Sequence, residues 1–154
     1  MTATALAAGA RRLTAAEWWV LAESAAVAFA IEGALRLVPQ ARILRAVERP
    51  VAPAAAIDRA AVDRLARLAS WPSRLLPIPR SCLRVSLVQT AVLRRHGFPA
   101  SLRLGVRRAA GAVEFHAWVD CGGVIDDEAG VAGYAAFDPL PVSAVPASRS
   151  ARWS

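Results

Sequence analysis

The sequence predicts an α+β domain in which several helices precede a small antiparallel sheet. Apolar residues recur at helical spacing over the first half of the chain, and a proline-marked break follows at 71–80. Alternating segments joined by glycine-containing turns then run from 101 to 127. Apolar residues make up 56% of the 154 residues, which is enough to build one hydrophobic core.

Residues 14–38 form the first predicted helix. Thr14, with Glu17 three residues later, makes a capping box at its start. Glu23 and Glu32 interrupt the apolar stretch inside it, and the uncharged run between them is too short to span a bilayer. We therefore expect a buried core helix and no membrane span.

Two shorter helices and a break come next. A short amphipathic helix is predicted over 41–48, and another helix over 57–70, where apolar residues recur every three or four positions. The three prolines of 71–80 cannot continue a helix, so we expect a break there.

A further helix is predicted to begin at Ser81 or Cys82 and to run to His96, with Gly97 as the left-handed residue after its end. Unpaired N–H groups and the positive end of the dipole favour an anion at a helix start, so they favour the thiolate of Cys82. His96 is expected to serve the last carbonyls of the helix. Cys82 is therefore the candidate nucleophile.

Residues 101–108 and 113–120 are the predicted strands, and a third short run covers 123–127. Alternation along 113–120 gives one polar face and one apolar face. The polar face holds Glu114, His116, Trp118 and Asp120, and the core face holds Val113, Phe115, Ala117 and Val119. His116 is thus the candidate base, and Trp118 is expected to wall a substrate cleft beside it.

The double glycine after the second strand allows a tight hairpin in two registers. A turn at Cys121–Gly122 puts Asp127 directly across from His116, whereas a turn at Gly122–Gly123 makes it a diagonal neighbour on the same face. Both registers favour Asp127 as the carboxylate that orients the imidazole, but a bulge would exchange it for Asp126. The Cys121 thiol is expected to be exposed and incidental at the turn.

Cys82, His116 and Asp127 together make a cysteine–histidine–carboxylate set. In such a set the thiolate attacks a carbonyl, and the histidine holds the cysteine proton and later returns it to the leaving amine. The aspartate fixes the tautomer of the histidine. Backbone N–H groups at the head of the helix can bind the developing oxyanion.

The segments that carry this set resemble the transglutaminase-like cysteine proteases of lasso-peptide biosynthesis, which remove the leader from a ribosomally made precursor. One departure is Val85, because the family usually has an arginine three residues after the cysteine, and here Arg84 precedes that position. The resemblance covers roughly residues 80–127 and rests on Cys82–Leu83, Leu93–Gly97, Leu102–Val106, His116–Asp120 and an aspartate after the hairpin, Asp126 or Asp127.

The resemblance implies a stand-alone peptidase with a transglutaminase-like, papain-like core and no metal or organic cofactor. It implies three partners: a precursor peptide with leader and core, a separate precursor-recognition protein, and an ATP-dependent macrolactam cyclase that closes the ring after leader removal. We expect a flexible N-terminus over 1–13, one peptidase domain over 14–136 with a helical part (14–72) and a catalytic part (79–136), and a Pro/Ser-rich tail over 137–154.

The composition indicates the cellular compartment of the protein and the kind of partner that it binds. Two cysteines make no disulfide framework, and the N-terminus lacks the pattern of a signal peptide, so we expect a cytoplasmic protein with free thiols. The net charge is +7, but the arginines are scattered and have no interleaved aromatic residues. A solvated basic surface that attracts an acidic peptide is therefore favoured over nucleic-acid binding.

Two alternatives keep the same fold. The first is a transglutaminase-like acyltransferase, in which an amine replaces water as the acceptor. The second is a scaffold that binds peptide without cutting it, for which an unreactive Cys82 would be the sign.

Overall fold

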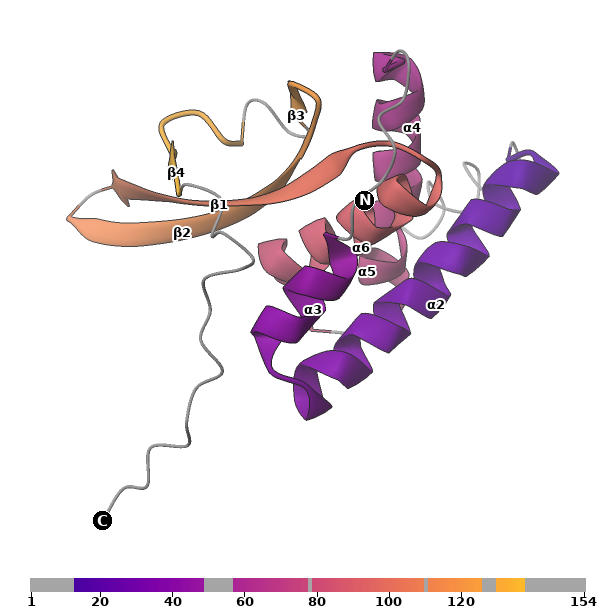
Figure 1. Ribbon diagram of the computed structural model, residues 1–154, viewed down its shortest axis with the longest axis horizontal. Coiled ribbons are helices and arrows are strands. Elements are labelled where there is room, and N and C mark those ends of the chain that lie inside the picture. The colour runs from indigo at the N-terminus through magenta and orange to yellow at the C-terminus, as the bar shows by residue number, and fades with distance from the viewer. Residues whose placement is uncertain (1–12, 49–56, 78, 110, 126–129, 138–154) are drawn as a thin grey trace.

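Within the described residues, helices come first along the chain and strands follow, which confirms the predicted α+β class. The computed structural model describes residues 13–48, 57–77, 79–109, 111–125 and 130–137. The helices are α2 (Ala15–Leu37), α3 (Gln40–Val47), α4 (Arg59–Ser70), α5 (Pro72–Leu75) and α6 (Cys82–Arg95). The strands are β1 (Ala100–Ala109), β2 (Ala112–Cys121), β3 (Val124–Ile125) and β4 (Ala135–Ala136). Figure 1 shows the sheet on one side of the molecule and the helices on the other.

The capping box predicted at the start of α2 is present. The Thr14 side chain accepts a hydrogen bond from the Glu17 amide at 3.3 Å, and the Glu17 carboxylate accepts one from the Thr14 amide at 2.8 Å. Arg64 of α4 also donates to Glu17, at 2.7 Å. The hydrogen bonds from Thr14 and Arg64 lower the pKa of Glu17 to about 2. Glu17 therefore stabilises the start of α2 and ties this helix to α4.

The proline-rich break differs from the prediction in one respect. A single helical turn, α5, forms inside it, with Pro72 at a position where its missing N–H leaves no intrahelical bond unmade. The chain then leaves the helix at Leu76, which has an extended backbone. Among the described residues, the helices all lack the length or the apolar character that crossing a membrane requires.

The sheet is antiparallel throughout and has the strand order β3-β2-β1-β4. The long hairpin of β1 and β2 pairs Ala100 with Cys121 at one end and Ala109 with Ala112 at the other. The next turn falls at Gly122–Gly123, whose φ angles are +62° and +87°, and Cys121 then pairs with Val124. Two left-handed residues in a two-residue turn match the twist of the flanking strands, which is why glycines occupy both positions.

Helix α6 is the element that joins the two layers. Ser81 caps its start, and it ends at Arg95, with His96 as the C-cap before Gly97, which has the predicted left-handed φ of +84°. It packs against α2 and α4 on one side and against β1 and β2 on the other. Its buried residues meet a core from both layers that includes Val62, Leu65 and Ala66 of α4, Leu87, Val92 and Leu93 of α6, and Ala117, Val119 and Cys121 of β2.

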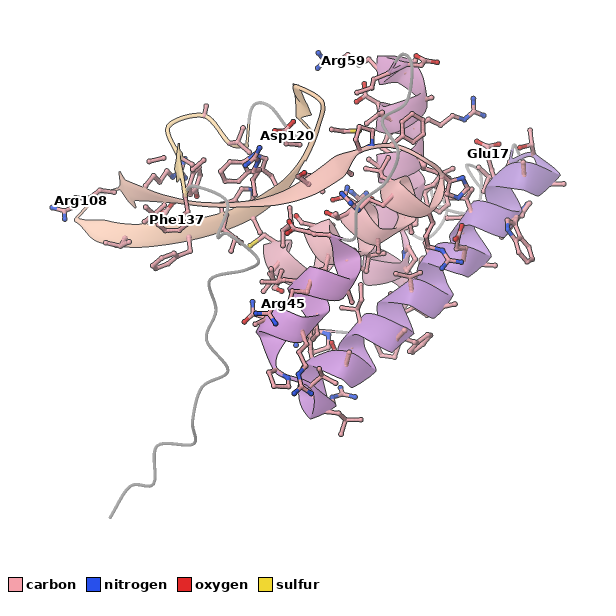
Figure 2. The ribbon with its side chains drawn as sticks, in the orientation of Figure 1. Glu17, Arg45, Arg59, Arg108, Asp120 and Phe137 are labelled. Atoms are coloured by element: carbon pink, nitrogen blue, oxygen red, sulfur yellow. The ribbon has the colours of Figure 1, made fainter. Side chains whose placement is uncertain are left out.

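The apolar face of β2 is buried along only part of its length, which corrects the prediction that it faces the core throughout. Ala117 and Val119 are buried, but Val113 and Phe115 are 51% and 70% exposed. The hairpin extends beyond the helices at that end, where Figure 2 labels Arg108. Strand alternation sets which side a residue takes, but not whether a helix covers that side.

Candidate active site

Cys82 is the first residue of α6, and its thiol is exposed. The Ser81 side chain accepts a hydrogen bond from the amide of Arg84 at 3.3 Å. The earlier amides of the first turn have no carbonyl partner within a helix, so those of Cys82 and Leu83 are the donors available at the head of α6. The structure thus confirms the position predicted for the cysteine.

His116 lies on β2 and is enclosed by two aromatic rings. Its ring stacks on Trp118 at a centroid distance of 6.2 Å and an interplanar angle of 18°. Tyr134 lies against it at 5.3 Å with a tilt of 37°. Rings at these distances attract each other and restrict the rotamer of the imidazole.

One buried hydrogen bond holds the helix of Cys82 beside the strand of His116. Ser86 Oγ donates to the carbonyl of Ala117 at 2.9 Å. Ser86 lies one helical turn after Cys82 and on the same side of α6, while Ala117 is next to His116 in β2. The bond therefore fixes the first turn of α6 against the edge of β2 at the level of His116.

Cys82 and His116 line the same cleft, which has a volume of about 720 Å³. Trp118 also lines it, as predicted. The remaining lining residues come from α4, α5, the segment before α6, α6 and β2: Arg67, Ser70, Arg74, Arg80, Ser81, Val85, Ser86, Gln89 and Ala117.

Trp118 reaches its place because β1 has a glycine opposite His116. Gly105 is the cross-strand partner of His116, and a Cβ added there would lie 2.6 Å from Trp118 Cη2 and 2.9 Å from the carbonyl oxygen of Ala135. Both distances are shorter than any ordinary contact of a Cβ atom. The indole therefore lies over the backbone of β1, and the imidazole stacks on the indole.

The carboxylate partner of His116 stays a prediction, because Asp126 and Asp127 lie outside the described residues. The observed turn at Gly122–Gly123 is the second of the two predicted registers, the one in which Asp127 was expected as a diagonal neighbour rather than the direct partner. Asp120 does not serve the histidine in the structure. Its carboxylate accepts hydrogen bonds from the amide of Gly123 at 2.9 Å and from Arg103 at 3.3 Å.

Tyr134 is a site residue that sequence reasoning missed. It is held from behind, since Arg107 lies 4.5 Å from the centre of its ring and its hydroxyl donates to Glu114 at 3.2 Å. Burial raises the pKa of Tyr134, the charge of Arg107 opposes this rise, and the hydrogen bond to Glu114 adds to it. The one feature of the sequence that could have drawn attention to Tyr134 is that it is the only tyrosine of the chain. It lies in a segment for which no strand was predicted.

The other cysteine and the other histidine lie elsewhere. Cys121 is fully buried as the last residue of β2, which corrects the expectation of an exposed turn residue and follows from the turn's falling one position later. Burial, together with the charge of Asp120, raises the pKa of the Cys121 thiol. His96 contacts Glu23 of α2 through Nε2 at 2.8 Å and is absent from the cleft lining.

The departure at Val85 has a structural counterpart. Val85 lines the cleft, whereas Arg84 points to α2 and donates to Glu32 at 2.8 Å. Glu32 is buried and also pairs with Arg36 at 2.9 Å. Arg84 therefore holds α6 to α2, and the side chain that lines the cleft at position 85 is the apolar Val85.

Within the described ranges, no group of three or more His, Cys, Asp or Glu side chains could hold a metal ion. The residues that line the cleft suit nucleophilic chemistry. An exposed thiol at a helix start, an imidazole on a neighbouring strand and free amides at the helix head supply a nucleophile, a base and oxyanion donors.

A family model matches residues 25–142, and it is described as the transglutaminase-like superfamily. The match includes most of α2, all of α6 and the whole described sheet, and therefore both Cys82 and His116. No curated protein matches the chain, and no solved structure does.

Proposed function

This chain belongs to the transglutaminase-like superfamily, and we propose that within it the protein is a cysteine peptidase that removes the leader from a lasso-peptide precursor. Proteins of this superfamily share a fold that typically serves cysteine proteases and acyltransferases. The choice of leader removal rests on the sequence resemblance around Cys82–Leu83, Leu93–Gly97 and His116–Asp120.

One structural observation carries the catalytic part of the proposal: Cys82 and His116 line one cleft, and the Ser86–Ala117 hydrogen bond holds their two elements together. The Cys82 thiolate attacks the carbonyl carbon of the scissile peptide bond. The proton held by His116 passes to the leaving amine, which departs with the core peptide. Water, deprotonated by the same imidazole, then releases the leader from the thioester.

Two further groups have assigned roles in this reaction. The amides at the head of α6 stabilise the oxyanion of each tetrahedral intermediate. Asp127 orients His116, with Asp126 as the alternative carboxylate. A precursor-recognition protein delivers the leader, and an ATP-dependent cyclase closes the ring on the freed amine of the core.

The test uses the chain with Cys121→Ser, so that one thiol remains. This protein is incubated with a precursor peptide and its recognition protein, and cleavage is followed by mass spectrometry. Cys82→Ala and His116→Ala are expected to abolish cleavage. His96→Ala is the matched control and is expected to keep it, because His96 contacts Glu23 away from the cleft. Undiminished cleavage by Cys82→Ala would refute the proposal.

The same experiment separates hydrolysis from acyl transfer. An added primary amine competes with water for the thioester, so an acyltransferase would give mainly the amide product, whereas a peptidase gives mainly the free acid. The pair Asp126→Asn and Asp127→Asn then identifies the carboxylate, because only the variant that loses the orienting group is expected to lose activity.

A further inference from the structure

The cleft beside Cys82 has charged side chains of one sign. Arg67 of α4, Arg74 of α5 and Arg80 of the segment before α6 all line it. Their guanidinium groups are charged at any physiological pH, and all three residues are exposed. No aspartate or glutamate is among the described residues that line the cleft. Three arginines thus line the cleft together with His116 and Trp118 of β2.

Arginines elsewhere on the described surface are mostly neutralised by carboxylates. Such pairs, with distances of 2.5 to 3.9 Å, involve Arg36, Arg59, Arg64, Arg84, Arg95, Arg103 and Arg107. At the cleft the situation differs, since neither Arg67 nor Arg80 has an ion-pair partner among the described residues.

From this asymmetry we infer that the cleft selects a peptide carrying carboxylates close to the bond that is cut. The inference rests on the proposed peptidase function and adds the substrate class to it. A carboxylate matches the planar fork of a guanidinium and can accept two hydrogen bonds from it. Arg80 lies two residues before Cys82 in the chain, so a carboxylate bound there lies within a few residues of the attacked carbonyl.

The inference is tested by binding, so that it does not depend on cleavage. The full chain carrying Cys82→Ser is titrated into fluorescein-labelled twelve-residue peptides of Gly, Ser and Ala with blocked ends. One peptide has three central glutamates and a second has three glutamines. A third is the glutamine peptide with a free C-terminal carboxylate, which separates a side-chain carboxylate from a terminal one.

We expect the glutamate peptide to bind roughly tenfold more tightly than the glutamine peptide at low salt, as a few exposed charge pairs would give. This difference should shrink as ionic strength rises. The double variant Arg67→Gln/Arg80→Gln should lose most of it. Arg74 is left unchanged because it interacts with another residue of the chain.

The matched control is the double variant Arg42→Gln/Arg108→Gln, which removes two exposed arginines that do not line the cleft. Figure 2 shows Arg108 at the end of the sheet that extends away from the helices. The control should keep the preference for glutamate. Equal affinity for the two peptides, or equal losses in the two double variants, overturns the inference, since the second result assigns the effect to the net charge of +7.

The outcomes of the two proposals are distinguishable. Glutamate selection without cleavage of any precursor leaves the cationic cleft in place and overturns the peptidase. If cleavage depends on Cys82 but does not change when glutamates near the scissile bond are replaced by glutamine, the peptidase function stands and the selection of carboxylates is overturned. A preference for the free C-terminal carboxylate alone overturns selection of side chains near the cut bond.

Discussion

Replacing Gly105 by alanine should disturb the site through Trp118. The added Cβ would lie 2.6 Å from Trp118 Cη2, 2.8 Å from Cζ3 and 2.9 Å from the carbonyl oxygen of Ala135. Carbon atoms in ordinary contact are about 3.5–4.0 Å apart, so the indole must retreat by roughly 1 Å. Trp118 is only 7% exposed, and His116 stacks on it, so the imidazole moves as well.

Two effects of opposite sign set the change in stability. Overpacking in a filled site destabilises by about 1–3 kcal/mol. Alanine also reduces the conformational entropy of the unfolded chain, which stabilises by about 0.4–1 kcal/mol, because Gly105 does not have a left-handed backbone. The net expectation for Gly105→Ala is a loss of about 1–2 kcal/mol in the free energy of unfolding. A 1 Å displacement of His116 is expected to lower kcat by about 100-fold.

The assay combines urea denaturation with the rate at which iodoacetamide alkylates Cys82 in the Cys121→Ser background. Gly33→Ala in α2 is the matched control, since nothing lies within 4 Å of the methyl group that it adds. That variant should be more stable by about 0.5–1 kcal/mol and should keep the alkylation rate. The reasoning is wrong if Gly105→Ala is as stable as the parent and Cys82 reacts at an unchanged rate.

Three further expectations concern single residues. Ser86→Ala leaves the buried carbonyl of Ala117 without its donor and should lower the free energy of unfolding by about 1–3 kcal/mol in urea denaturation, whereas an unchanged midpoint would show that the bond is dispensable. The pKa of Glu17 is depressed to about 2 in the folded protein, so its contribution to stability is full above the unfolded pKa near 4.5 and is lost as the pH falls toward 2. In Glu17→Gln, the midpoint of urea denaturation should therefore change less with pH between pH 4.5 and 2 than it does in the parent protein. An equal change in both proteins would contradict the lowered pKa of Glu17. Iodoacetamide at pH 7.5 should modify Cys82 alone in the folded protein and both cysteines after denaturation, whereas rapid labelling of Cys121 would contradict its burial.

Local signals were sufficient to place Cys82 and His116 in their secondary-structure elements. The side-chain cap of Ser81 and the left-handed backbone of Gly97 define the ends of α6 locally, so the prediction of Cys82 at a helix start required no knowledge of the rest of the fold. The alternation along β2 likewise placed His116 and Trp118 on one face. Both inferences depend only on the periods of the helix and the strand.

Features that depend on distant parts of the chain were not predictable in this way. Cys121 was assigned to the turn because a double glycine permits two registers, and pairing with Ala100 and Val124 selects between them. The exposure of Phe115 depends on where the helices stop covering the sheet. Tyr134 reaches the site because the adjacent strand β4 pairs with β1. The two alanines of β4 give no signal in the sequence that predicts a strand.

The hydrogen bond from Ser86 to Ala117 marks a seam between the helical and sheet halves of the chain. Cys82 comes from one side of this seam and His116 from the other. Each half has its own backbone hydrogen bonds, but if the halves separate slightly, Cys82 and His116 no longer line one cleft. The rate of the reaction at this site is therefore a stricter test of the contact between the two halves than helical content is. A partner protein that holds the two halves together would raise this rate without touching the substrate.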